Sequence, residues 1–149
     1  MRAALEEAET AFKENEIPIG AIIVVSGNII SRQHNRNRAL IDPTAHAEIL
    51  ALREAALKLG VFRLVDAEIY ITVEPCPMCA GAMLYSRIKK AVYGCFDPKA
   101  GCDVSVCNLL NNSGFNHKVE TVSGILADKS AELLGKFFKE KRALKKKYE

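Results

Sequence analysis

The sequence predicts an α/β fold, a three-layer α/β/α sandwich on a mixed sheet of about five strands. Short runs rich in β-branched residues alternate with longer helical segments, which is the order expected when helices cover a sheet. The first two predicted strands are separated only by Ser26-Gly27-Asn28, which is typical of a hairpin turn, so the sheet is expected to be mixed.

The composition indicates one domain, spanning residues 1–149. A chain of 149 residues can bury a core, and 49% hydrophobic with 26% charged residues is typical of a globular protein. No repeat or Pro/Gly/Ser-rich linker marks a boundary, and no apolar run approaches the roughly 18 residues of a membrane helix. Three glutamates in the first twelve residues disfavour a signal or transit peptide, so a cytoplasmic protein is expected.

The first part of the chain predicts one helix and a hairpin. An alanine-rich segment over residues 3–12 has helical spacing, and this helix is expected to end near Asn15. Residues 19–25 (IGAIIVV) form a continuous β-branched run, which is typical of a buried strand. Residues 29–31 (IIS) supply its hairpin partner, and the polar segment 32–42 is expected to be a loop.

The next helix is expected to begin at Asp42-Pro43-Thr44. Asp42 or Thr44 would cap its first turn, because the side-chain oxygens of both residues can accept hydrogen bonds from unpaired N–H groups. The helix is expected to continue to about Leu59 and to stop at Gly60, since glycine readily adopts the left-handed conformation that follows many helices.

The second half continues the alternation of strands and helices. Residues 67–73 (AEIYITV) and 90–96 (KAVYGCF) are expected to be strands, separated by a helix that begins at Pro77. A weaker strand is expected over residues 118–124 (KVETVSG). The basic C-terminal segment 128–149 is expected to be a long helix.

Two short motifs predict a metal site. Cys76 and Cys79 stand three residues apart at a helix start, where both thiols face the same way and the exposed N–H groups favour the thiolate. Together with His46 they provide three ligands, the number that a catalytic zinc uses while its fourth position stays open. One Zn²⁺ per chain is therefore the expected cofactor.

Glu48 follows His46 by two residues in an otherwise apolar stretch, PTAHAEIL. An ionised carboxylate is costly to bury unless a positive group lies beside it, and a metal ion would supply that charge. Beside a metal-bound water, Glu48 could take a proton and return it to a leaving group, as hydrolytic release of ammonia from an amidine-like ring carbon requires. Because residues two apart face nearly opposite sides of a helix, we expect the pair in an irregular first turn or on different sides of the water.

Other interpretations of these residues remain open. A C-x-x-C pair also occurs in redox sites, and a histidine in an apolar helix is often a hydrogen-bonded core residue. A structural zinc could take its fourth ligand from Cys95, Cys102, Cys107 or His117, but this would leave Glu48 without a role. Because the five cysteines are irregularly spaced, they indicate free thiols or metal ligands, and Cys102 and Cys107 are expected to be packing or loop thiols.

The pattern H-A-E followed by P-C-x-x-C resembles the signature of zinc-dependent nucleobase deaminases. The resemblance extends through IPIGAIIV, DPTAHAEILALREA, YITVEPCPMCAGAMLYSRI, the FDPKAG loop and NLLNNSGFNHKVE, and these segments are similar to those of bacterial tRNA-specific adenosine deaminases. It implies a cytidine deaminase-like fold, a homodimer and conversion of the wobble adenosine of a tRNA anticodon to inosine. The apolar segment AMLYSRI could then supply an interface helix.

The resemblance also implies roles for the catalytic residues. His46, Cys76 and Cys79 would bind zinc. A zinc-bound water would attack C6 of adenine, Glu48 would carry protons, and ammonia would leave.

Further residues are assigned to the RNA by the same resemblance. Asn35 would hold the flipped nucleoside, and the backbone at Ala47 and Cys76 would help to place the water and the ring. The loop around Asp97 and Lys99 would lie along the neighbouring nucleotides. Without the resemblance, Asn35 and Asp97 would be interpreted only as turn formers.

Two positions depart from some members of this family. Some relatives carry a small residue where Cys95 stands and a basic residue where Phe96 stands. These departures bear on the contacts to the flanking bases. Phe96 could offer stacking in place of charge.

The C-terminal segment carries most of the positive charge. Residues 136–149 contain seven basic and two acidic side chains, a charge of +5, which leaves −2 on residues 1–135 given the total of +3. Phe137 and Phe138 precede Arg142 and the lysine run 145–147, and aromatic plus basic side chains on one helix suit splayed RNA bases and phosphates. The alternative is a terminal helix docked by its aromatic residues, and one phenylalanine could pack while the other meets RNA.

Three functions compete. The first is a tRNA adenosine deaminase that acts on an anticodon stem-loop. The second is a deaminase of free bases or nucleosides such as guanine or cytosine, which the Asp97 loop and the basic helix disfavour. The third is a non-catalytic, zinc-stabilised RNA-binding module, which would give Glu48 no role.

Overall fold

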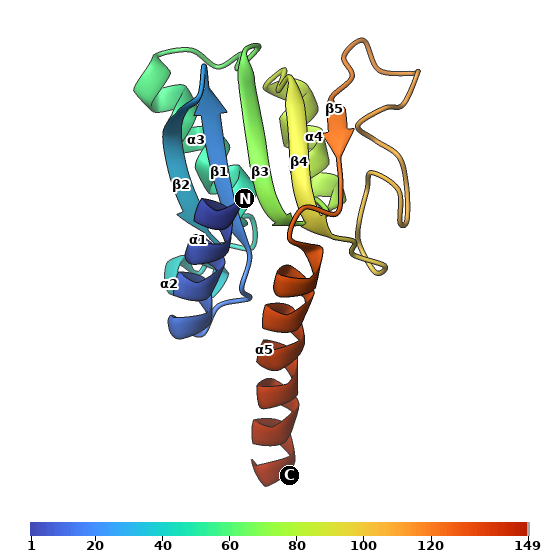
Figure 1. Cartoon of the computed structure of the whole chain (residues 1–149). Coiled ribbons are helices and arrows are strands. Elements are labelled where there is room, and N and C mark those ends of the chain that lie inside the picture. Colours follow the sequence, from blue (N-terminus) through green and yellow to red (C-terminus); the bar gives the residue numbers. More distant parts are fainter. Residues whose placement is uncertain (149) are drawn as a thin grey trace.

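Five strands form one sheet with the order β2-β1-β3-β4-β5 in the computed structural model, which describes residues 1–148 (Figure 1). The strands are β1 Gly20–Val25, β2 Asn28–His34, β3 Ala67–Val73, β4 Lys90–Cys95 and β5 Glu120–Val122. Strand β1 runs antiparallel to β2 and β3, whereas β3, β4 and β5 run parallel to one another. The predicted mixed sheet, beginning with a hairpin, is therefore confirmed.

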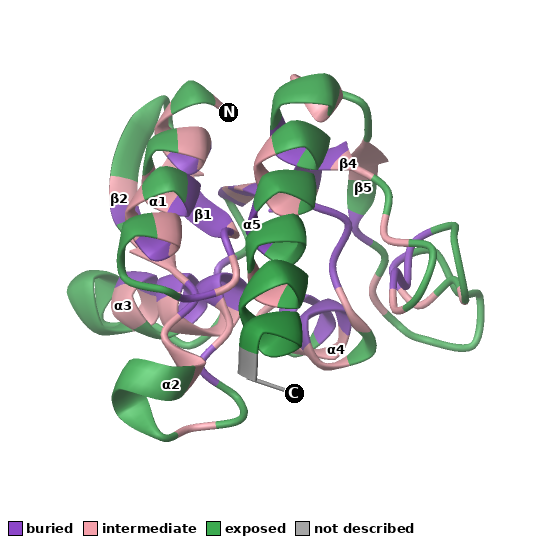
Figure 2. Cartoon of the chain, turned by 90° about the horizontal axis from the view of Figure 1, so that it is seen from below, coloured by how far each residue is buried: buried purple, intermediate pink, exposed green. Residues whose placement is uncertain are grey.

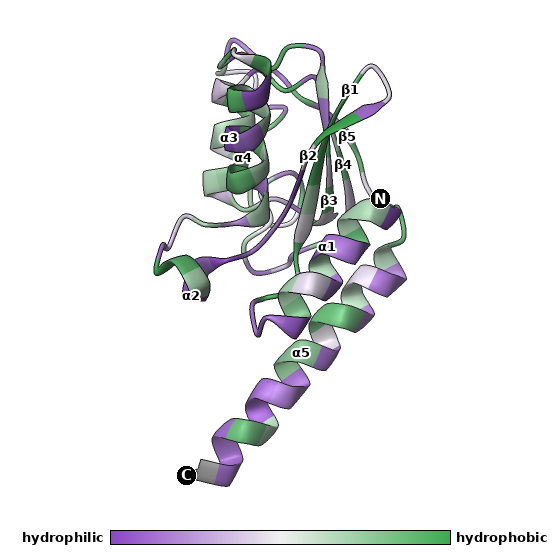
Figure 3. Ribbon diagram, turned by 90° about the vertical axis from the view of Figure 1, so that its left-hand side faces the viewer, coloured by the Kyte–Doolittle hydropathy of each residue, from purple (hydrophilic) through white to green (hydrophobic). Residues whose placement is uncertain are grey.

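Helices cover both faces of this sheet (Figure 3). The helices are α1 Arg2–Lys13, α2 Asn37–Leu40, α3 Ala47–Leu59, α4 Pro77–Tyr85 and α5 Ala127–Tyr148. Helices α1 and α5 lie on one face, and α3 and α4 lie on the other, which confirms the three-layer arrangement. The predicted C-terminal helix corresponds to α5, although its last predicted residue, Glu149, lies outside the described residues.

The main core lies between the sheet and the layer formed by α3 and α4. Ile69 and Ile71 of β3 and Tyr93 of β4 are fully buried in it. On the other face α1 packs very closely on β1, because a side chain at Gly20 would collide with the backbone oxygen of Ala4. Figure 2 shows that the later turns of α5 are exposed, so this helix is only partly docked on the body.

The segment 32–42, which the sequence predicts as a loop, contains the end of a strand and a short helix. Strand β2 continues to His34, paired with β1, and α2 follows it. Polar side chains are compatible with this strand because it lies at the sheet edge. Arg32 there binds Glu6 and Glu7 of α1, with N···O distances of 2.7 and 3.0 Å. The loop prediction is wrong because backbone pairing with β1 outweighs the polar composition.

Helix α3 begins at Ala47, later than predicted. The carboxylate of Asp42 accepts hydrogen bonds from the N–H and the hydroxyl of Thr44, at 2.8 and 2.7 Å, and these bonds close a local turn rather than a helix. His46 keeps an extended backbone, with φ −73° and ψ 150°, and occupies the N-cap position. The predicted stop at Gly60 is confirmed, where φ is 68°.

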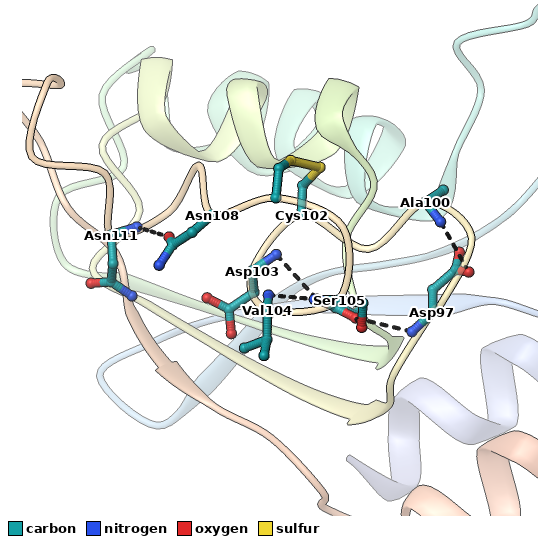
Figure 4. The surroundings of a disulfide bond; sticks show 10 residues. Asp97, Ala100, Cys102, Asp103, Val104, Ser105, Asn108 and Asn111 are labelled. Carbon is teal, nitrogen blue, oxygen red and sulfur yellow. Dashed lines mark hydrogen bonds between the residues drawn. A yellow bond between two sulfur atoms is a disulfide. The ribbon is translucent and has the colours of Figure 1, made fainter.

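Cys102 and Cys107 form a disulfide in the loop between β4 and β5 (Figure 4). This corrects the expectation that both are packing or loop thiols. The loop folds back so that the two Cα atoms lie 4.6 Å apart, a separation that a disulfide can span. A spacing of five residues in the sequence does not reveal such a fold-back. Cys76, Cys79 and Cys95 are free thiols.

The disulfide predicts the outcome of a thiol count. Denatured protein without reductant should take up three equivalents of iodoacetamide, at Cys76, Cys79 and Cys95, because sulfur atoms in a disulfide do not react with this reagent. After reduction all five cysteines should be alkylated. Mass spectrometry of the intact chain gives the count, and five equivalents before reduction would contradict the disulfide.

Candidate functional site

The N-termini of α3 and α4 bring three potential metal ligands together. His46 is the N-cap of α3 and Cys76 is the N-cap of α4, both with extended backbone, while Cys79 lies in the first turn of α4. The sulfur atoms of Cys76 and Cys79 each lie 3.6 Å from Nδ1 of His46. The three ligand atoms lie within 4.8 Å of one another. Pro77 occupies the first turn of α4, as the sequence predicts.

The separations within this cluster fit a tetrahedral metal ion. Zinc–sulfur bonds of about 2.3 Å and zinc–nitrogen bonds of about 2.0–2.1 Å, at the tetrahedral angle, place sulfur and nitrogen about 3.6 Å apart. Both sulfur–nitrogen distances in the cluster equal this value. Two thiols and one imidazole are also ligands that zinc prefers. The residues present therefore fit a zinc ion with one position left for a non-protein ligand.

One ligand of the cluster is ionised even without a metal. Hydrogen bonding with Cys79 and with His46 lowers the pKa of Cys76 to about 4, against the opposing effect of burial. The hydrogen bond with Cys76 also raises the pKa of His46. Cys79 keeps its proton, because the neighbouring Cys76 sulfur and burial both raise the pKa of its thiol. The two helix N-termini favour negative charge at the same place.

Glu48 lies beside this cluster and is almost fully buried, which is unusual for a carboxyl group. Its side chain is in the first turn of α3 and is only 3% exposed. Burial raises the pKa of the carboxyl to about 7. One carboxyl oxygen, Oε2, is buried without a hydrogen-bond partner in the part of the chain that the structure describes. Because His46 precedes the helix in an extended conformation, the helical spacing that would separate it from Glu48 does not apply.

Asn35 fastens the start of α3 to the end of β2. It is 2% exposed, its backbone N–H donates to the carbonyl oxygen of Ile19 at 3.1 Å, and its Oδ1 accepts the backbone N–H of Ala47 at 2.8 Å. The N–H of Ala47 is therefore engaged by Asn35 in this structure. The expectation that the backbone at Ala47 helps to place the water and the ring stays a prediction.

A cavity of about 540 Å³ opens over the cluster. This volume lies within the range of about 300–1,000 Å³ found for small-molecule sites. Its floor is formed by His46, Glu48 and Cys76, with Asn35 beside them. The walls are Ile17, Ile19, Val73, Glu74, residues 96–100, Leu134, Gly135, Phe138 and Arg142. The cavity therefore joins the candidate metal ligands to the 96–100 loop and to α5.

Of the residues expected to contact RNA, some line the cavity and one does not. Asp97, Lys99, Phe138 and Arg142 line the cavity. Phe137 does not line it. Its side chain is 3% exposed and packs edge-on against Phe12 of α1, with ring centroids 5.8 Å apart. This corrects the expectation that both phenylalanines bind substrate, because docking α5 on α1 leaves only one of them at the cavity.

Two basic side chains of α5 also belong to this docking contact. The Lys136 and Lys141 ammonium groups lie over the rings of Phe12 and Phe137, at 5.2 and 5.1 Å from their centroids. These positions favour a cation–π contribution to the packing of α5. Part of the basic character of the helix is therefore structural, whereas Arg142 faces the cavity.

Cys95 and Phe96, the two positions that depart from some relatives, lie in different surroundings. Phe96 is 51% exposed, lines the cavity and packs edge-on against Tyr93, with centroids 5.9 Å apart. The sulfur of Cys95 instead faces the carbonyl oxygen of Thr72 at 3.8 Å. Of the two, only Phe96 is placed to meet a ligand in the cavity.

Glu74 is a residue of the site that was not expected from the sequence. This carboxylate lines the cavity although its side chain is only 2% exposed. Burial opposes its ionisation, but hydrogen bonds from the Ser105 hydroxyl and from the backbone N–H groups of Val104, Ser105 and Asp97 outweigh burial and lower the pKa. The sequence does contain a signal for this role, because Glu74 is an acidic residue directly after a predicted buried strand and two residues before Cys76, a predicted metal ligand.

Comparison with known proteins identifies the family. A family profile described as MafB19-like deaminase matches residues 1–142. The tRNA-specific adenosine deaminase of Bacillus subtilis is 47% identical over 146 residues, which cover 98% of this chain and 91% of the relative. This chain belongs to the tRNA-specific adenosine deaminase family. A relative of the same name from Aquifex aeolicus is 46% identical over 95% of this chain and 93% of its own length.

A similar solved structure supports the assignment of this chain to the tRNA-specific adenosine deaminase family. It comes from a study of A-to-I editing by tRNA deaminases at the wobble position of transfer RNA, and it matches with a TM-score of 0.87 and 43% identity. The match covers 90% of this chain and 97% of that one. The fold is therefore that of the cytidine deaminase group, as the resemblance implied.

The burial of Glu48 predicts a pH-dependent stability in metal-free protein. A carboxyl whose pKa is raised by folding holds its proton more tightly when folded, so the free energy of unfolding falls as pH rises from its ordinary pKa towards about 7. Glu48→Gln should remove this fall and make the chelator-treated protein more stable at pH 8, by about 3 kcal/mol at most.

Urea unfolding at pH 5 and pH 8 measures this effect. Glu9→Gln, at an exposed position of α1, serves as a control that should follow the parent. A Glu48→Gln variant that loses as much stability as the parent between the two pH values would show that Glu48 is not buried as described.

Proposed function

We propose that this protein hydrolyses the wobble adenosine of a tRNA anticodon to inosine and releases ammonia. The observation that carries the proposal is a buried carboxyl group with an unpaired oxygen, beside a His-Cys-Cys cluster on the floor of a nucleoside-sized cavity. The names of the relatives and the described activity of the similar structure support the same reaction in tRNA.

His46, Cys76 and Cys79 would hold one Zn²⁺ per chain. The matching sulfur–nitrogen separations and the donor set support this assignment. When bound, zinc supplies a Lewis acid that makes water nucleophilic near neutral pH. The same cation would also offset the cost of burying the Glu48 carboxylate.

Glu48 would carry the proton through the reaction. Its carboxylate would take a proton from the attacking water and then deliver it to the departing amino group of the adenine ring. Burial raises the pKa of this carboxyl in the metal-free site, and a cation bound beside it would favour the ionised form that takes the proton. Its position at the cavity floor leaves room for a ring above it.

The cavity rim favours a nucleotide within RNA over a free base. Phe96 and Phe138 are 51% and 42% exposed at the rim, and Lys99 and Arg142 stand beside them. Aromatic faces stack bases, and cationic groups bind phosphates, so this combination suits a flipped nucleotide with its neighbours still attached. Asn35 would hold the nucleoside from the cavity floor, while the loop with Asp97 would follow the flanking nucleotides.

The other two functions account for less of the structure. A guanine deaminase from Nitrosomonas europaea shares the fold, with a TM-score of 0.79 and 25% identity, but a free base would leave the aromatic and basic rim without a role. A zinc-stabilised module without catalysis would leave the buried Glu48 carboxyl unexplained.

A homodimer is part of the proposal. Tyr85, at the end of α4, is 88% exposed beside a second cavity of about 340 Å³ that Leu84 and Phe115 also line. An exposed apolar surface of this kind is typical of association sites, so we place the contact with a second copy there.

Each chain would act as a single deaminase domain in the cytoplasm. Among residues 1–148, no helix combines the length and the apolar character that crossing a membrane requires.

The proposal predicts a substrate-selective release of inosine. Purified protein should form inosine from an arginine-tRNA anticodon stem-loop, and an ammonia assay should detect no release from free adenosine, guanine or cytosine, because only the stem-loop engages the rim. Glu48→Gln should retain zinc and RNA binding but lose turnover by about a hundredfold or more, since proton transfer is removed. Liquid chromatography of digested RNA gives the inosine, and metal analysis gives the zinc.

Two outcomes of this experiment would contradict the proposal. Turnover of a free base with none on RNA would overturn the substrate. Undiminished turnover by Glu48→Gln would overturn the catalytic assignment. Glu9→Gln, on the exposed face of α1, is the matched control for loss of one carboxylate.

A further inference from the structure

Glu74 is a buried carboxylate whose oxygen atoms are surrounded by donors from one loop. It follows β3 directly. One oxygen, Oε1, accepts the backbone N–H groups of Asp103, Val104 and Ser105 at 3.1, 2.8 and 3.0 Å. The other, Oε2, accepts the N–H of Asp97 at 3.0 Å and the hydroxyl of Ser105. Both ends of the segment 97–105 are therefore tied to a single side chain.

No cation shares this carboxylate within residues 1–148, since none of the ion pairs found there includes Glu74. Its charge is instead stabilised by N–H dipoles, three of them from consecutive residues that together form an anion-binding concavity. Such an arrangement is directional, because each bond fixes the position of one peptide group. The carboxylate therefore sets the shape of the loop in a way that a mobile lysine partner would not.

Three features of the loop allow it to pack closely around this carboxylate. A side chain at Gly101 would collide with the carboxyl group of Glu74, so the absence of a Cβ there allows the loop to pass. The disulfide between Cys102 and Cys107 spans the three N–H donors, and the loop around it is shown in Figure 4. The N–H of Cys102 also donates to the carbonyl oxygen of Pro75, at 2.8 Å, which ties the loop to the segment that leads into α4.

The same loop forms one wall of the cavity, through Phe96, Asp97, Pro98, Lys99 and Ala100. Glu74 itself stands two residues before Cys76 at the cavity floor. One short stretch of chain thus carries both a candidate metal ligand and the group that holds the opposite wall. Glu74 therefore connects the chain at the floor to this wall through its hydrogen bonds.

We propose that Glu74 is a positioning residue that fixes the 96–105 loop against the cavity floor and thereby sets the affinity for the nucleotides that flank the reacting adenosine. This inference rests on the proposed function for its substrate. Glu74 would touch neither the metal nor the reacting atoms. Its loss should therefore weaken the binding of RNA more than the chemical step.

Glu74→Gln tests this role with little change of volume. The amide offers one acceptor oxygen in place of two and turns an NH₂ group towards donors, so one end of the loop must be released. We expect KM for the anticodon stem-loop to rise about tenfold or more, with kcat changed less than about threefold, because loop displacement removes binding to the flanking nucleotides. Zinc content should stay at the level of the parent.

Hydrogen exchange gives a readout that does not depend on the substrate. In Glu74→Gln the amides of Asp97, Asp103, Val104 and Ser105 should exchange faster than in the parent. Glu16→Gln is a matched control, because Glu16 is equally buried, at 2% exposure, and accepts the N–H groups of Arg38 and Ala39 at 2.8 Å each. That control should accelerate exchange at the start of α2 but not in the 97–105 loop.

Parental KM together with parental exchange in Glu74→Gln would overturn the proposal. A fall in kcat at unchanged KM would also overturn it, because Glu74 would then act on the floor. If Glu74→Gln does not fold, Ser105→Ala removes only the hydroxyl donor and should shift KM and exchange in the same directions by less, and no shift in either would overturn the proposal. A parent that forms no inosine on RNA would refute the proposed function, while exchange would still decide whether Glu74 anchors the loop.

Discussion

The structure depends on the meeting of two helix N-termini at a cluster of ionisable groups, of which Glu48 and Cys79 are buried. His46 and Cys76 end extended segments, and α3 and α4 start immediately after them on the same face of the sheet. The N–H groups of both first turns favour a thiolate and a carboxylate, but they do not remove the cost of burying Glu48. A divalent cation between His46, Cys76 and Cys79 would remove it.

The floor and one wall of the cavity are held by buried side chains that accept hydrogen bonds from backbone N–H groups. Asn35 fixes the start of α3 at the floor, and Glu74 fixes the loop after β4 that forms the wall. Loops carry the residues that meet a substrate, yet they have few apolar contacts of their own. Internal carboxylate and amide anchors give such loops a defined shape, as a site that must grip a flexible nucleotide requires. The docking of Phe137 on Phe12 does the same for α5.

Much of the fold and the chemical centre could be predicted from local sequence signals. The β-branched runs predicted β1 and β3, Gly60 predicted the end of α3, and Pro77 predicted the start of α4. The spacing of Cys76 and Cys79 predicted that both thiols face the same way. The failures have a different cause, because they depended on contacts that composition and spacing do not reveal, some of them distant in the sequence and some, such as the Asp42–Thr44 turn, local. Pairing with β1 extended β2 into polar residues, the turn at Asp42 delayed α3, and packing on α1 decided which of two adjacent phenylalanines is buried. The Cys102–Cys107 disulfide and the anchoring by Glu74 likewise depend on the fold-back of a loop, which spacing alone does not encode.

X-ray absorption at the zinc edge tests most directly whether this arrangement is built around a catalytic metal. The zinc-loaded protein should show two sulfur ligands at about 2.3 Å, one imidazole nitrogen at about 2.0–2.1 Å and one further oxygen. Cys79→Ala should lose a sulfur ligand or the metal, whereas Cys95→Ala should leave the spectrum unchanged. A zinc closed by four sulfur or nitrogen ligands, or no tightly held zinc, would contradict a site whose fourth position is open beside Glu48.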